Sequence, residues 1–229
     1  MHTVISYIEE RQAKLARHPF FSELHTEGTL EELLAFAPRL GTWVHAFQLV
    51  LRINGQGVQD PELRTMLVRH AAEEGGHDTW FFEDVAELYG RSAAAGVEAS
   101  ETDRMALALM KEAGALPADE LRLVFLLALE ATSELFFDHV TPLVEAKGGN
   151  ARLRYFGRHH QDAEDAHTVF EAEVHARVEA IALDEAMRSQ AKALVDRIFA
   201  SFALLFDGLR AAPPFVPKVQ RQVLGALRA

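Results

Sequence analysis

Along most of the chain, apolar residues recur at intervals of three and four, the spacing of one face of an amphipathic helix. Glycines, prolines and helix-capping residues divide this pattern into about seven predicted helices. Their approximate bounds are residues 3–17, 29–53, 60–89, 100–114, 117–147, 151–182 and 184–211. No segment alternates between apolar and polar residues as a strand does between turn signals. The sequence therefore predicts an all-α fold in a single helical domain over residues 1–229, with residues 213–229 as a C-terminal tail.

One polar pattern, His-x3-Glu-x2-His, interrupts two of these apolar faces. It comprises His70, Glu74 and His77 in the first instance, and His160, Glu164 and His167 in the second. Helix positions offset by 0, 4 and 7 share one face, and apolar residues continue that face on both sides. Burying a histidine or a glutamate costs several kcal/mol of free energy unless a partner compensates for it. We therefore interpret these residues as candidate metal ligands, the alternative being ordinary polar residues at a helix edge.

A further carboxylate, Glu130, lies in the middle of the most apolar stretch, LVFLLALEATSELFF at residues 123–137. A carboxylate in that position needs a metal ion, an arginine or a proton. Glu-x-x-His on each of two helices is the ligand arrangement of carboxylate-bridged di-iron sites. Three carboxylates and three neutral imidazoles nearly balance the charge of two divalent ions, and this mixture of ligands suits iron or manganese. The charge balance favours two metal ions over one.

Gly75 and Gly76 separate Glu74 from His77. Glycine inside a helix costs about 1 kcal/mol relative to alanine, so two adjacent glycines need a reason. We expect either that the helix bends or partly unwinds at the site, or that it packs closely against a neighbouring helix.

Three further polar residues are each compatible with more than one role. His70 is a metal ligand, a base that acts beside the ligands, or a packed core histidine. His45 and Gln48 lie one turn apart on the helix predicted at residues 29–53 and are candidates for contact with substrate. A lone histidine on an amphipathic helix is more often structural.

Composition narrows the class of protein. The chain has no cysteine, which excludes disulfides, thiolate zinc sites, iron–sulfur clusters and a cysteine nucleophile. The net charge is −11 and no tract is densely basic, so we expect neither a nucleic-acid partner nor an anionic membrane surface. No run of 18 apolar residues predicts a membrane span, and the first residues do not resemble a signal peptide. A cytoplasmic protein is the expectation.

The ordered ligand set resembles that of the haem-oxygenase-like di-iron oxidases and oxygenases, within the superfamily of TenA-like and PqqC-like proteins. The segment EEGGHDTWFFEDVAELYG (residues 73–90) is similar to the third-helix Glu…His segment of that family. Residues 160–167 resemble its His-x3-Asp/Glu-x2-His motif, and Glu130 lies where the family has its middle glutamate. His18-Pro19-Phe20 and Gly28-Thr29-Leu30 are similar to the start of TenA-like domains. The resemblance implies a haem-oxygenase-like bundle.

Carried over to this sequence, the resemblance implies a particular set of metal ligands. They are Glu74, His77, Glu130, His160, Glu164 and His167. The cofactors would be two iron ions, with manganese as the alternative metal, and dioxygen would be the co-substrate. The expected activity is an O2-dependent oxidoreductase that oxidises a small amino-acid-like or fatty-acid-like substrate, supplied with electrons by a donor that the sequence does not identify. The superfamily also suggests a homodimer.

Other functions are compatible with the same residues. PqqC-like members of the superfamily oxidise a bound organic substrate without metal, whereas TenA-like thiaminases use a cysteine, which this chain lacks. A ferritin-like bundle with the same chemistry needs a carboxylate from its first long helix, and residues 39–53 offer none. A non-catalytic helical binding or scaffold protein is the alternative from a different class.

Overall fold

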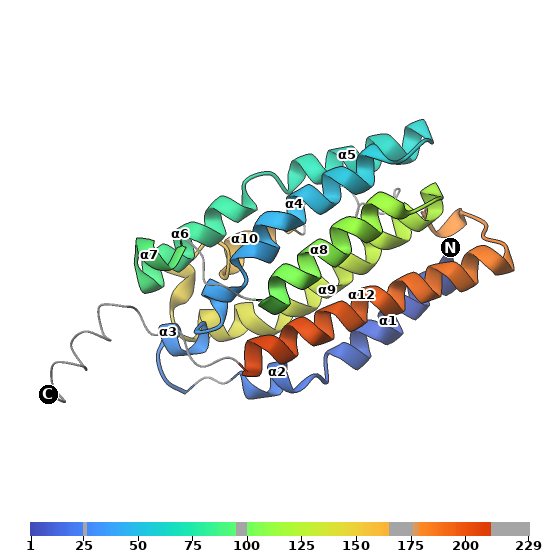
Figure 1. The fold of residues 1–229 in the computed structure, drawn as a ribbon. Coiled ribbons are helices and arrows are strands. Elements are labelled where there is room, and N and C mark those ends of the chain that lie inside the picture. The colour runs from blue at the N-terminus through green and yellow to red at the C-terminus, as the bar shows by residue number, and fades with distance from the viewer. Residues whose placement is uncertain (25–26, 95–99, 165–175, 177, 212–229) are drawn as a thin grey trace, which may run out of the picture.

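The described part of the chain is helical. The structure, a computed structural model, describes residues 1–24, 27–94, 100–164, 176 and 178–211. Within these ranges the chain forms α-helices and short 3-10 helices and has no strand (Figure 1). This confirms the all-α prediction. The tail predicted at residues 213–229 lies outside the described residues.

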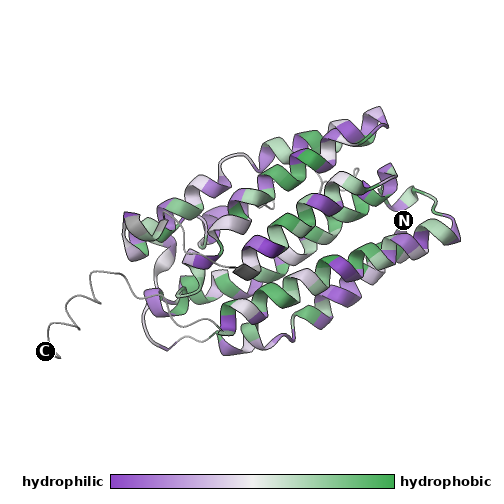
Figure 2. Cartoon of the chain, viewed as in Figure 1, coloured by the Kyte–Doolittle hydropathy of each residue, from purple (hydrophilic) through white to green (hydrophobic). Residues whose placement is uncertain are grey.

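The five longest of the described helices run roughly along one direction (Figure 1). They are α1 (His2–Leu15), α4 (Gly41–Gln56), α8 (Ser100–Ala115), α9 (Asp119–Ala146) and α12 (Glu185–Ala211). Helix α9 packs against α1, α4 and α12, and its buried residues extend from Leu121 to Val144. A helix that is apolar on nearly all sides belongs inside a bundle, which explains why the most apolar stretch of the sequence occupies this position. Figure 2 shows apolar and polar residues mixed along α12 and α5, as expected for the amphipathic helices around it.

The remaining elements are shorter and lie between or beside the long helices. They are α2 (Pro19–Glu23), α3 (Leu30–Leu33), η1 (Ala37–Arg39), α5 (Pro61–Glu73), α6 (His77–Tyr89), α7 (Arg91–Ala94), η2 (Gly149–Ala151) and α10 (Arg158–Glu164). The described residues thus form eleven α-helical segments, against about seven predicted. One reason is Pro38, which interrupts the helix predicted at residues 29–53 with a 3-10 segment. Among the described helices, none is both long and apolar enough to cross a membrane.

The helix predicted at residues 60–89 is divided in two at its glycine pair. Helix α5 ends at Glu73 and α6 begins at His77. Gly76 has a φ of +100°, a backbone conformation that glycine adopts easily and other L residues rarely do. A Cβ atom added at Gly76 would meet nothing within 4 Å, so close packing against a neighbour does not explain this glycine. The predicted bend is therefore present, and its cause is the left-handed backbone.

We expect Gly76→Ala to lower the free energy of unfolding by about 1–2 kcal/mol, because alanine is strained at a positive φ. Gly114→Ala is the matched control. Gly114 lies inside α8 without a positive φ, and the nearest atom to an added Cβ is a methyl carbon of Ile53 at 3.9 Å. That variant should be stabilised by about 0.5–1 kcal/mol. Urea unfolding measures both changes, and an unchanged stability of Gly76→Ala would contradict the left-handed backbone.

Candidate metal centre

Five of the predicted site residues come together inside the bundle. His70 lies in the last turn of α5, Glu74 directly follows that helix, and His77 begins α6. Glu130 lies in the middle of α9, and His160 lies in α10. None of the five is more than 6% exposed. Segments that are distant in the sequence therefore bring imidazoles and carboxylates to one buried place.

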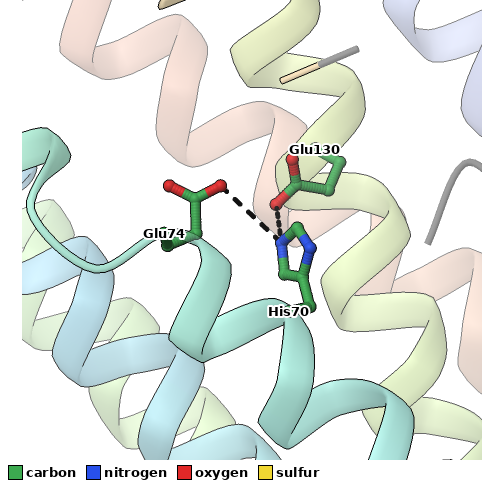
Figure 3. Close-up of side chains that lie close together, drawn as sticks. All are labelled: His70, Glu74 and Glu130. Carbon is green, nitrogen blue, oxygen red and sulfur yellow. Dashed lines mark hydrogen bonds and ion pairs between the residues drawn. The ribbon is translucent and has the colours of Figure 1, made fainter. Parts of the chain in front are cut away.

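The first group of ligand atoms consists of His70, Glu74 and Glu130 (Figure 3). Nε2 of His70 lies 2.9 Å from Oε1 of Glu130 and 3.9 Å from Oε1 of Glu74. One ligand atom from each residue lies within 4.8 Å of the others. Ligand atoms at about 2.1 Å from one ion are at most about 4.2 Å apart, so a small contraction would let these three hold an ion.

A second group shares Glu74 with the first. Oε2 of Glu74 lies 3.0 Å from Nδ1 of His77, and Nε2 of His160 lies 3.1 Å from the same nitrogen. The two oxygens of Glu74 thus face different imidazoles, Oε1 toward His70 and Oε2 toward His77. A carboxylate in this position can bridge two ions. The same contacts are also compatible with two buried ion pairs between carboxylates and protonated imidazoles.

Two of the predicted ligands cannot be placed. Glu164 ends α10, one helical turn after His160, but its side chain lies outside the described part of the structure. His167 lies outside the described residues altogether. Their role as ligands stays a prediction.

Aromatic rings hold the two histidines of the second group. The ring of Tyr155 stacks on His160 with centroids 4.6 Å apart, and Phe137 meets the same imidazole edge-on at 4.2 Å. Trp80 stacks on His77, with centroids 4.6 Å apart. These contacts restrict the ring planes of both imidazoles.

The two residues predicted to contact substrate lie in different surroundings. Gln48 is buried, and its Nε2 donates to the backbone oxygen of Glu74 at 3.1 Å and to Oδ1 of Asp78 at 3.0 Å. It thereby holds the interrupted segment between α5 and α6. The side chain of His45 is 77% exposed and makes a long contact with Asp78. This position gives no support to a substrate-binding role for His45.

A narrow cavity adjoins the centre. Glu74, His77 and His160 form part of its wall, together with Gln48 and Asp78. Aromatic side chains dominate the rest of the wall, namely Trp43, Phe47, Phe136, Phe137, Phe202 and Phe206. The cavity has a volume of about 60 Å³. A small, slim organic molecule would therefore lie directly beside the centre.

Asp84 is a functional candidate that the sequence analysis missed. It lies on α6, is 2% exposed, and accepts backbone hydrogen bonds from Arg154 at 2.9 Å, Tyr155 at 2.8 Å and Phe156 at 3.1 Å. Burial raises the pKa of Asp84 above its usual value, and the three N–H groups oppose that rise. Because these bonds hold the backbone of Tyr155, they also position the ring that stacks on His160. The sequence did contain a signal for Asp84, since it is an acid on the apolar face of a predicted helix.

Comparisons with known proteins support the fold alone. No family model matches the chain, and no curated protein matches it either. Among solved structures, it is similar to a domain of unknown function with a haem-oxygenase-like fold from Shewanella denitrificans. The two are 16% identical, with a TM-score of 0.60 over 92% of this chain and 90% of the other. The protein therefore has a haem-oxygenase-like fold, as the resemblance implied.

We expect Asp84→Asn to lower the free energy of unfolding by about 2 kcal/mol, because an amide replaces charge-assisted acceptors and turns an N–H donor toward backbone N–H groups. Glu83→Gln is the control at the adjacent position. Glu83 is exposed and contacts Arg154 only at 4.0 Å, so its replacement should change stability by less than about 0.5 kcal/mol. Urea unfolding measures both, and equal effects would show that Asp84 does not hold residues 154–156.

Proposed function

We propose that the protein is a non-haem oxidase or oxygenase that uses two metal ions, iron in the first instance, to oxidise a small organic substrate with dioxygen. The observation that supports this most directly is the position of Glu74 between two groups of buried ligands. Redox-active ions held there would supply the electrons for dioxygen reduction, which the side chains of the centre do not supply. An external electron donor is part of the proposal, and manganese is the alternative metal.

The roles of the side chains follow from their surroundings. Glu74 and Glu130 would neutralise the positive charge of the ions inside an apolar core. His70, His77 and His160 would provide neutral nitrogen ligands whose rings are fixed by packing and by contacts with carboxylates. Gln48 holds the backbone at Glu74, and the aromatic wall of the cavity limits the access of water to the substrate. The arrangement separates a polar centre from an apolar compartment for the substrate.

An anaerobic titration with Fe(II) tests the metal centre. Chelator-treated protein should bind about two equivalents of iron, with a rise in melting temperature, because ions that bind only the folded state stabilise it. Glu74→Gln should lose both sites, and Glu130→Gln should lose one. Glu134→Gln is the matched control, because Glu134 lies one turn further along α9, is exposed and contacts Gln12. It should bind iron as the unmodified protein does.

The outcome also separates the alternatives. If the protein binds less than about one equivalent and its melting temperature does not change with iron, the histidines and glutamates form structural ion pairs and a scaffold or metal-free enzyme is favoured. If iron binds, admitting air should change the visible absorption spectrum and consume oxygen. An iron-loaded protein with no spectral change and no oxygen consumption would leave a metal site but would contradict the proposed oxidase.

A further inference from the structure

The polar part of the cavity wall presents hydrogen-bond acceptors. Asp78 and Glu74 contribute carboxylates. Thr132 also lines the cavity, and its hydroxyl donates its proton to the carbonyl of Leu129 at 2.7 Å, so it offers a ligand no further donor. The amide nitrogen of Gln48, a potential donor, is already engaged by Glu74 and Asp78. A ligand group that lies against these two carboxylates must itself donate hydrogen bonds, because a carboxylate only accepts them.

The charge of the wall is also one-sided. No lysine or arginine is among the described residues that line the cavity. Without metal, the carboxylates of Glu74 and Asp78 make the described part of this wall negative, so it does not attract an anionic ligand.

Asp78 is placed to receive a cationic group. It lies in the first turn of α6, with its side chain 21% exposed. Its Oδ1 accepts hydrogen bonds from Gln48 and from the backbone N–H of Thr79 at 2.9 Å. Among the described residues, its Oδ2 makes only the long 3.4 Å contact with the exposed His45. An ammonium group beside Oδ2 would add the short charge-assisted bond that this oxygen lacks.

We propose that the cavity binds a primary amine on a slim apolar body, an unbranched alkyl chain or a flat aromatic group. The aromatic walls take the apolar body, while the carboxylate of Asp78 takes the ammonium group. A primary amine with a pKa near that of lysine, about 10.4, is protonated at pH 7. As a statement about the substrate this rests on the proposed function, but binding of the amine itself does not require metal.

Three probes of equal chain length test the proposal: hexylamine, hexan-1-ol and hexanoate. Calorimetry at pH 7 with both chelator-treated and iron-loaded protein should show hexylamine binding at least tenfold more tightly than hexanoate. In Asp78→Asn the advantage of hexylamine over hexan-1-ol should disappear. Asp103→Asn, a change of the same kind on the exposed face of α8, should keep that advantage. The melting temperature of each variant checks that it is folded.

Two results would overturn the inference. One is hexanoate binding as tightly as hexylamine in either form, and the other is no measurable binding of hexylamine in both. Both the binding of hexylamine and the binding of hexanoate are measured with the unmodified protein, so the test does not depend on the folding of a variant. Hexylamine binding to a protein that takes up no iron would support the cavity assignment while the proposed oxidase fails. Iron uptake without amine binding would support the metal centre and overturn the cavity assignment.

Discussion

The contact between His70 and Glu130 joins α5 to the buried middle of α9. Glu130 cannot reach water from that position, because other helices surround α9 on nearly all sides. An uncompensated carboxylate there would cost several kcal/mol, a large share of the total stability of a domain. In the described part of the chain, the group that compensates for it is the imidazole of His70 on α5. The packing of α5 against α9 is therefore tied to the chemistry of the centre, since separating the two helices would leave an unpaired acid in the core.

The interruption at Gly75 and Gly76 gives Glu74 its shared position. Because α5 ends just before Glu74, that carboxylate is not confined to the side of a continuous helix, and its two oxygens face His70 and His77. A break in a helix also leaves backbone groups without their usual partners. The side chain of Gln48 compensates in part, since it donates to the carbonyl of Glu74. A left-handed glycine and a buried amide thus act together to place one carboxylate between the imidazoles of His70 and His77.

The spacing of ionisable residues on apolar faces predicted much of the candidate centre. His70, Glu74 and His77 meet Glu130 and His160 because acids and imidazoles on apolar faces must find each other in the core. The number of helices was less predictable, since short segments depend on contacts that are distant in the sequence. Helix α10 begins only at Arg158. The backbone N–H groups of residues 154–156, which precede it, donate hydrogen bonds to the carboxylate of Asp84. Periodicity describes one helix at a time, so it cannot show such a bond between segments.

Metal ions and an ammonium group are both cations, but the two proposals place them at different groups of residues. An ion needs several donor atoms converging at about 2.1 Å, and His70, Glu74 and Glu130 approach that arrangement. An ammonium group needs acceptors at about 2.8 Å, spread around it and backed by an apolar surface for the attached body. Asp78 provides such an acceptor on the wall of the aromatic cavity. Because Gln48 links the carbonyl of Glu74 to the carboxylate of Asp78, a ligand that moves Asp78 would also act on the backbone that carries the shared Glu74.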